Sequence, residues 1–281
     1  DHCRITQISR RMKIIEQLVV GKKSQEECED GIIVNENFAA VIDGSTSKTP
    51  IRMNGLCSNG RYCMELIKNC INSISSDIDV YGFCQYMTKS IYSKYIDLKI
   101  DVERLKLHPE ERITASAIVY SSKLRQVWMI GDCQCLVGGC FYDNPKPYEQ
   151  ELAEQRALFL REAINNGITP ESVSIKDCGR ESILPELVKC CRYQNVSYAV
   201  IDGFDIPMDK VRVINVDEGI NELVLASDGY PFLKPTLDES EAMLASQLEN
   251  DPLCMNTFKA TKGLMAGNKS FDDRSYLRVG I

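Results

Sequence analysis

The chain alternates between short apolar segments typical of strands and longer segments with the hydrophobic spacing of helices. Two apolar runs between Gly31 and Asp43 surround a turn-like Asn-Glu-Asn sequence, which predicts a hairpin of two buried strands. Ile113–Tyr120 and Gln126–Ile130 are rich in β-branched and aromatic residues and predict a second hairpin. Residues 3–20 are basic and then apolar, so we expect a strand or an edge helix there. Further strands are expected at Leu136–Tyr142, which continues the sheet, and at Tyr198–Ile201, Val211–Val216, Leu223–Ala226 and Tyr276–Val279.

Helical spacing appears in groups between these strands. Gly60–Ile74 and Phe83–Tyr95 each place apolar side chains on one face. Tyr148–Asn165 is followed by a glycine placed to end a helix, and a capping box at Thr236 begins a late one. Because hairpins dominate, the pattern indicates an α+β protein of antiparallel sheets covered by helices. No linker-like stretch divides the chain, so we expect one domain over residues 1–281.

Composition narrows the function classes. Lys+Arg 33 against Asp+Glu 40 gives a net charge of −7, which argues against a nucleic-acid partner. No apolar run approaches the roughly 18 residues of a membrane span, and the first 20 residues are too charged for a secretory signal. The 13 cysteines include no CxxC spacing, so we expect reduced thiols and a cytoplasmic protein. A Ser-His-Asp site would have to use His108, which lies in a polar stretch typical of a solvated loop.

The chemically informative residues are acids at the ends of apolar strands. Asp43, Asp132 and Asp228 each close such a strand. Another pair, Asp272 and Asp273, opens the last strand, and Glu29-Asp30 precedes the first hairpin. Carboxylates that converge in this way repel one another unless cations neutralise them, and oxygen ligands without His or Cys favour Mg²⁺ or Mn²⁺. The pattern therefore predicts a divalent-metal site.

Each acid also has a simpler explanation, because Asp-Gly after a strand is a common turn signal. The tetrapeptide Val-Ile-Asp-Gly occurs twice, at Val41–Gly44 and at Val200–Gly203. Only Asp43 has an acidic companion at the other end of its hairpin, thirteen residues before it at Asp30. We therefore interpret Asp202 as a turn residue and Asp43 as a site residue.

Read in order, these pieces resemble the type 2C metal-dependent serine/threonine protein phosphatases, and the last motif is most similar to their bacterial branch. The resemblance spans about residues 21–279 and implies an α-β-β-α sandwich of two antiparallel sheets flanked by helices. The motifs that carry it are Glu29-Asp30, Ala40-Val41-Ile42-Asp43-Gly44, Thr114-Ala115-Ser116-Ala117, Gly131-Asp132-Cys133, Ala226-Ser227-Asp228-Gly229 and Asp272-Asp273-Arg274-Ser275.

The resemblance also implies a role for each acid. Asp43 would bridge two Mn²⁺ or Mg²⁺ ions, and Asp43, Asp228 and Asp272 would be the catalytic set. The remaining implied ligands are the acidic pair Glu29 and Asp30, the Gly44 carbonyl, Asp132 for a third ion, and Asp273 as a substitute for Asp272. The implied reaction removes phosphate from phosphoserine or phosphothreonine in proteins, by attack of a water that bridges the two ions.

Three departures and several rival functions bear on this hypothesis. Ser45 stands where many members have a histidine, and the usual glycine pair of that loop is missing. Gln25 stands where a phosphate-binding arginine is usual, so Lys22 or Lys23 would have to reach the phosphate. These losses favour an alternative, a pseudophosphatase that binds a phosphoprotein or another partner without turnover. A third possibility is a structural sandwich whose acids are only turns. A haloacid-dehalogenase-like mechanism needs an aspartate where the chain has Val41, and no Cys-x5-Arg phosphatase loop occurs. We expect the region of about residues 148–209 to lie near the site and shape specificity.

Overall fold

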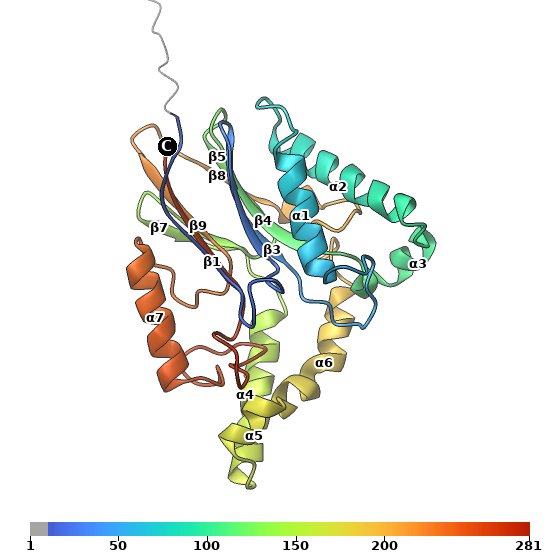
Figure 1. Ribbon diagram of the computed structural model, residues 1–281, viewed down its shortest axis with the longest axis vertical. Coiled ribbons are helices and arrows are strands. Elements are labelled where there is room, and N and C mark those ends of the chain that lie inside the picture. The colour runs from blue at the N-terminus through green and yellow to red at the C-terminus, as the bar shows by residue number, and fades with distance from the viewer. Residues whose placement is uncertain (1–10) are drawn as a thin grey trace, which may run out of the picture.

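Within residues 11–281, which the computed structural model describes, ten strands form two five-stranded antiparallel sheets (Figure 1). The first expected element spans residues 3–20, of which residues 3–10 lie outside the described range. Lys13–Val20 of this element form a strand. The first sheet has the order β1 (Lys13–Val20), β10 (Arg274–Gly280), β9 (Glu222–Ala226), β6 (Gln134–Val137) and β7 (Cys140–Tyr142). The second has the order β2 (Asp30–Val34), β3 (Phe38–Gly44), β4 (Ala115–Ser121), β5 (Gln126–Ile130) and β8 (Arg212–Asn215).

The apolar run of β3 is continuous because both faces of this strand are covered. Ala39 and Val41 belong to the core between the sheets, together with Leu225 and Leu277 of the first sheet. The alternate residues Phe38, Ala40 and Ile42 belong to a second core beneath the helices. Successive side chains of a strand point to opposite faces, so one strand serves both cores.

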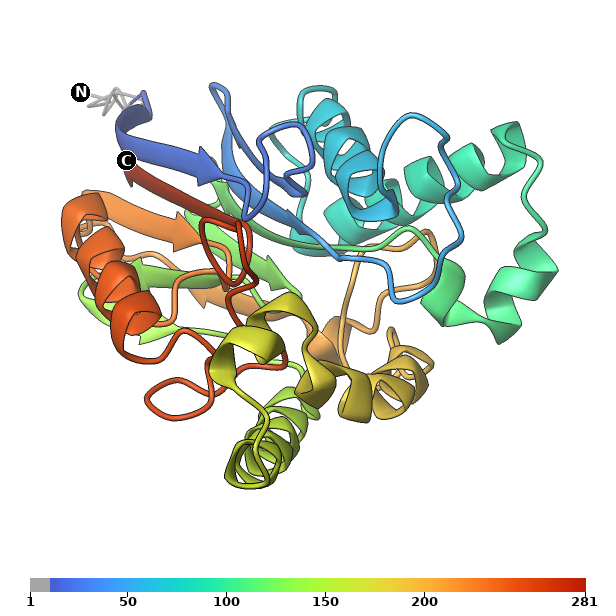
Figure 2. The same ribbon diagram turned by 60° about the horizontal axis from the view of Figure 1, so that its bottom comes forward.

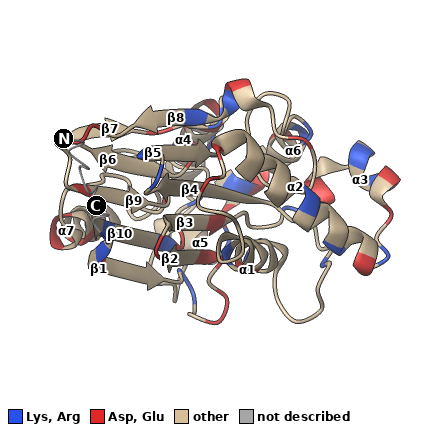
Figure 3. Ribbon diagram, turned by 90° about the horizontal axis from the view of Figure 1, so that it is seen from above, with Lys and Arg blue, Asp and Glu red and all other residues tan. Residues whose placement is uncertain are grey.

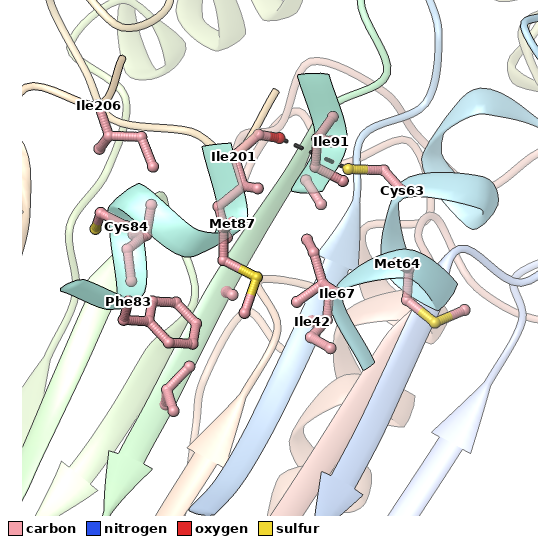
Figure 4. Close-up of a cluster of buried hydrophobic side chains, with 14 of the residues drawn as sticks. Ile42, Cys63, Met64, Ile67, Phe83, Cys84, Met87, Ile91, Ile201 and Ile206 are labelled. Atoms are coloured by element: carbon pink, nitrogen blue, oxygen red, sulfur yellow. Dashed lines mark hydrogen bonds between the residues drawn. The ribbon is translucent and has the colours of Figure 1, made fainter. Parts of the chain in front are cut away.

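Helices cover the outer faces of both sheets. Against the second sheet lie α1 (Asn59–Ile71) and α2 (Val80–Asp97), followed by the short α3 (Val102–Leu107). Figure 4 shows this core, where Ile67 of α1 and Met87 of α2 meet Ile42 of the sheet. The outer face of the first sheet is covered by α7 (Leu237–Asn250), whose Leu244 packs with Val224 and Tyr276.

A third group of helices lies at one end of the sandwich (Figure 2). It comprises α4 (Glu149–Asn165), α5 (Pro170–Ile175) and α6 (Cys178–Cys191). The fully buried Arg156 of α4 pairs with Asp177 at the start of α6, at 2.7 Å, and also donates to the Leu253 carbonyl at 2.8 Å. These contacts attach the group to the segment between α7 and β10. Figure 3 shows the charged residues spread over helices, loops and strand ends.

The structure confirms the fold class, α+β with two antiparallel sheets flanked by helices. The two hairpins, α1, α2, α4, α7 and the last strand lie where the sequence predicts them. Two expectations are wrong. Leu136–Tyr142 is not one strand but parts of β6 and β7, and these two strands belong to the first sheet, whereas the β4–β5 hairpin belongs to the second. Tyr198–Ile201 is not a strand either, because it makes only isolated bridges. Among the described residues, no helix is long and apolar enough to cross a membrane.

Candidate metal centre

Three aspartates from the two sheets meet at the end of the sandwich. Asp43 lies near the end of β3, and Asp132 and Asp228 each lie two residues beyond their strands, β5 and β9. One carboxylate oxygen of each lies within 4.8 Å of the other two, a spacing that could hold a cation. Asp272, two residues before β10, lines the same cavity. The antiparallel pairing places all four strand ends at one edge, although the residues lie up to 229 positions apart in the sequence.

Asp43 and Asp228 are the two members of this cluster that have no cationic partner. Neither forms an ion pair with a described residue, and one oxygen of each carboxyl group lies within 4.8 Å of one of the other. Burial, together with the charges of neighbouring aspartates, raises the pKa of both carboxyl groups well above its usual range. Without added positive charge, the ionised form of both carboxyl groups is therefore disfavoured.

Asp132, by contrast, has two partners. Its carboxylate accepts a hydrogen bond from the Ser116 hydroxyl at 2.7 Å and forms an ion pair with Lys146 at 2.7 Å. Burial would raise the pKa of Asp132, but the positive charge of Lys146 and these hydrogen bonds bring it below its usual value. Lys146 thus supplies locally the positive charge that Asp43 and Asp228 lack.

Asp272 is neutralised in the same way, by two lysines. Lys262 lies 2.6 Å from one carboxylate oxygen and Lys22 lies 3.3 Å from the other. Burial opposes ionisation, yet the two lysines lower the pKa of Asp272 to about 2. The neighbouring Asp273 points elsewhere, because its carboxylate accepts hydrogen bonds from the backbone N–H groups of Lys22 and Glu29 at 2.7 and 2.9 Å. Of the two acids between which the sequence could not decide, Asp272 is the one that lines the cavity.

The Glu29-Asp30 pair lies behind the cluster. Glu29 accepts hydrogen bonds from the hydroxyls of Thr46 and Ser58, both at 2.6 Å, and its carbonyl accepts from the Gly44 N–H at 3.0 Å. Asp30 lies directly opposite Asp43 in the β2–β3 ladder. One of its oxygens accepts from Ser227 and Ser275 at 2.6 and 2.7 Å, and the other is buried without a partner.

The two lysines proposed to bind phosphate are placed differently. Lys22 faces the centre, where it contacts Asp272 and the Thr46 hydroxyl. Lys23 forms an exposed pair with Glu27 and is not brought to the cavity. Gln25 turns back to its own segment, donating to the Val19 carbonyl at 3.2 Å.

Asp202 lies outside the site, as expected, but it is more than a turn residue. It is fully buried and forms an ion pair with Arg112 at 2.9 Å. Gln194 and Asn195 donate further hydrogen bonds to its carboxylate, at 2.7 and 2.9 Å. This acid therefore holds the segment before β4 to the segment after α6.

Sequence reasoning missed the basic residues of the site. Lys146, Lys262, Lys48 and Arg180 line the cavity together with the aspartates. Lys146 comes from the loop before α4, and Arg180 belongs to α6, within the region of residues 148–209 that we expected near the site. These basic residues belong to no sequence motif. The only feature of the sequence that could have predicted them is the excess of acidic residues, which need positive charge nearby.

The residues of the centre fit a divalent cation. The aspartates that converge there offer carboxylate oxygens, which hard cations such as Mg²⁺ and Mn²⁺ prefer. The unpaired Asp43 and Asp228 and the unpartnered oxygen of Asp30 mark where positive charge is lacking. The lysines on Asp132 and Asp272 mark where it is already supplied.

Comparison with known proteins identifies similar solved structures. No protein-family model matches the chain, and no curated protein matches it. The serine/threonine phosphatase PstP/Ppp of Mycobacterium tuberculosis is 14% identical over 96% of this chain and 99% of that chain, with a TM-score of 0.44. Stp1 from Staphylococcus aureus is 12% identical over 96% of each chain, with a TM-score of 0.46. The catalytic domain of PstP in complex with two manganese ions is 12% identical over 96% of this chain and 98% of that chain, with a TM-score of 0.45. All three are serine/threonine phosphatases. Because these identities and scores are low, we base the function on the residues of this chain.

Proposed function

We propose that this protein is a metal-dependent phosphomonoester hydrolase that removes phosphate from phosphoserine or phosphothreonine in proteins. The observation that carries the proposal is the half-buried pair Asp43 and Asp228, which shares a cavity with Asp272 and has no cation of its own. Burying carboxylates without compensating charge is costly, so such a pair indicates a site for divalent ions.

In this proposal Asp43, Asp228 and Asp272 hold two Mn²⁺ or Mg²⁺ ions, and Asp132 is the candidate ligand for a third. Glu29 and the Gly44 carbonyl would complete the set from the side of the first hairpin. The ions, when bound, supply Lewis acidity that activates water and neutralises phosphoryl charge. The two sheets contribute rigidity, because each aspartate lies at or just beyond the end of a paired strand. Lys22 would orient Asp272 and Thr46 rather than act as an acid or base. Burial alone would lower the pKa of Lys22, but the negative charges of Asp272, Asp273 and Glu29 outweigh it and raise the pKa above its usual range.

A second candidate is a phosphoprotein-binding module without turnover. The ion pairs of Lys146 with Asp132 and of Lys262 with Asp272 favour it, because the lysines compete with metal ions for these carboxylates. Gln25, which faces its own backbone, also favours it. The unpaired Asp43 and Asp228 favour the enzyme.

The two candidates differ in turnover. We expect hydrolysis of an aryl phosphate and of phosphopeptides that requires added Mn²⁺ or Mg²⁺ and stops with chelator. Asp43→Asn or Asp228→Asn should lower kcat/KM roughly 100-fold or more, since loss of even a supporting group of a metal ligand costs about 10–100-fold. Asp209→Asn, on an exposed aspartate, is the matched control. Calorimetric metal binding without turnover on a phosphopeptide panel would favour the binding module, and the absence of metal binding would contradict both candidates.

A further inference from the structure

The cavity at the metal centre contains cations of two kinds. Lys146 and Lys262 are already paired, with Asp132 and Asp272 at 2.7 and 2.6 Å. Lys48, from the loop after β3, forms no hydrogen bond or ion pair with any residue between 11 and 281. The two kinds of cation differ in function, because only Lys146 and Lys262 neutralise the charge of an aspartate.

Arg180, near the start of α6, is the second cation without a carboxylate partner. Its guanidinium donates one hydrogen bond, to the Thr261 carbonyl at 3.1 Å, and makes no ion pair within the described part of the chain. Burial lowers the pKa of both the Arg180 guanidinium and the Lys48 ammonium, and neighbouring cations lower that of Lys48 further. Both residues are half-buried, and a cation that is partly removed from water without a counter-charge is unfavourable, so the cavity favours an anion.

The fold holds Arg180 in place before any ligand arrives. The Asp177 carboxylate accepts a hydrogen bond from the Arg180 backbone N–H at 2.8 Å and also pairs with the buried Arg156. The Thr261 contact fixes the guanidinium from the other side. A planar fork that is already positioned loses little entropy when it binds an oxyanion.

We propose that Lys48 and Arg180 bind the phosphoryl oxygens of the substrate, with Arg180 as the bidentate donor and Lys48 as a point charge. The proposal rests on the proposed function, because it assigns the phosphate contacts of the same cavity. It places these contacts in the loop after β3 and in α6 rather than at Gln25. The acidic residues then hold the metal ions and the unpaired cations hold the phosphate, within one cavity of about 80 Å³.

The test uses inorganic phosphate as the probe, titrated calorimetrically into the full chain in the presence of Mg²⁺. Lys48→Met and Arg180→Gln should each weaken the phosphate Kd about tenfold or more, as expected for the loss of a charge-assisted hydrogen bond. Arg180→Lys should show an intermediate loss. Lys189→Met, on an exposed lysine of the same helix, should leave the Kd unchanged. The Mg²⁺ affinity and circular dichroism of every variant should match the wild type, which separates a phosphate contact from misfolding.

Turnover gives an independent readout that separates this proposal from the function itself. If the protein is a phosphatase, Lys48→Met should raise KM for a phosphopeptide more than it lowers kcat. The Lys48→Met, Arg180→Gln double variant tests both residues at once. If its turnover equals that of the wild type and its phosphate Kd stays within twofold, Lys48 and Arg180 do not bind phosphate, whereas the proposed phosphatase function is unaffected. If the wild type shows no turnover but both single variants lose phosphate binding, the result supports Lys48 and Arg180 as phosphate contacts and contradicts the proposed enzymatic activity. A wild type that binds no phosphate at millimolar concentration would overturn the assignment as well.

Discussion

Asp30 shows how one buried carboxylate depends on its surroundings. Burial raises the pKa of Asp30 to about 7, although the hydroxyls of Ser227 and Ser275 oppose the shift by donating to the ionised form. Its second oxygen has no partner. In an unfolded chain the same group titrates near pH 4. Between these two pH values the folded protein therefore holds a proton that the unfolded protein has released.

The pH dependence of stability follows from this difference in proton binding. In chelator, the contribution of Asp30 should be present below about pH 4 and be lost as pH rises towards 7, because the folded state binds more protons. Asp30→Asn keeps the shape of a protonated carboxyl and cannot ionise, so its free energy of unfolding should exceed that of the wild type by an amount that grows between pH 5 and pH 8. Urea unfolding across this range measures the difference, with Asp209→Asn as the control. A difference that does not change with pH would contradict the raised pKa.

At the scale of residues, the sequence indicates which aspartates lie close together, but it does not indicate which basic side chains pair with them. Asp43 and Asp202 share a tetrapeptide, and the companion Asp30 separated the aspartate that joins the acidic cluster from the one that does not. The sequence could not show that Asp202 meets Arg112, or that Lys146 and Lys262 reach Asp132 and Asp272. Such partners depend on side-chain contacts between segments that only the folded chain brings together.

At the scale of elements, the first helix and the third strand approach each other unusually closely. A Cβ atom on Gly44 of β3 would lie 2.2 Å from the Gly60 carbonyl oxygen, which belongs to α1. A Cβ atom on Gly60 would lie 2.6 Å from a carboxylate oxygen of Glu29 and 2.7 Å from the Ser45 carbonyl. Both positions need glycine so that the helix can rest against the end of the strand that carries Asp43.

Gly60→Ala should therefore force α1 away from the strand end. We expect a loss of about 1–3 kcal/mol in the free energy of unfolding, the usual effect of overpacking a tight contact. Gly55→Ala is the matched control, because a Cβ atom there meets no atom within 4 Å, and it should change stability by less than about 0.5 kcal/mol. Urea unfolding of both variants tests this, and equal stabilities would contradict the close approach.

The elements that the sequence predicts correctly are those with strong local signals. The β2–β3 hairpin has a turn between two apolar runs, and α7 begins at the capping threonine Thr236, whose hydroxyl accepts from the Glu239 N–H. The missed helix α6 contains Pro185 and three cysteines and lacks a clear apolar stripe. The sheet to which β6 and β7 belong is set by pairing with β9, nearly 90 residues later, so no local pattern could show it.

At the scale of the whole molecule, the candidate centre joins the two sheets. Asp43 and Asp132 come from strands of one sheet, and Asp228 and Asp272 adjoin strands of the other. A cation held by both pairs would therefore connect layers that otherwise meet through apolar contacts. Metal binding and the stability of the sandwich should be coupled.

Added Mn²⁺ or Mg²⁺ should raise the midpoint of thermal unfolding, because a ligand that binds only the folded state stabilises it. At 100 times Kd the gain is about 2.7 kcal/mol. For a chain of this size that corresponds to a shift of about 5–10 °C. Calorimetric scans with metal and with chelator measure it, and Asp228→Asn should abolish the shift while Asp209→Asn retains it. A wild-type midpoint indifferent to both metals would argue against the centre.

The position of β10 has a consequence for how the protein forms on the ribosome. This strand, Arg274–Gly280, lies between β1 and β9, so β1 has no neighbour in its own sheet until the chain has been made as far as Gly280. Until then the nascent β1, with its solvent-facing Ile14 and Ile15, leaves its backbone groups open to other chains. Synthesis that stops before Arg274 should therefore yield a product that self-associates or recruits chaperones, even though the complete second sheet is already present.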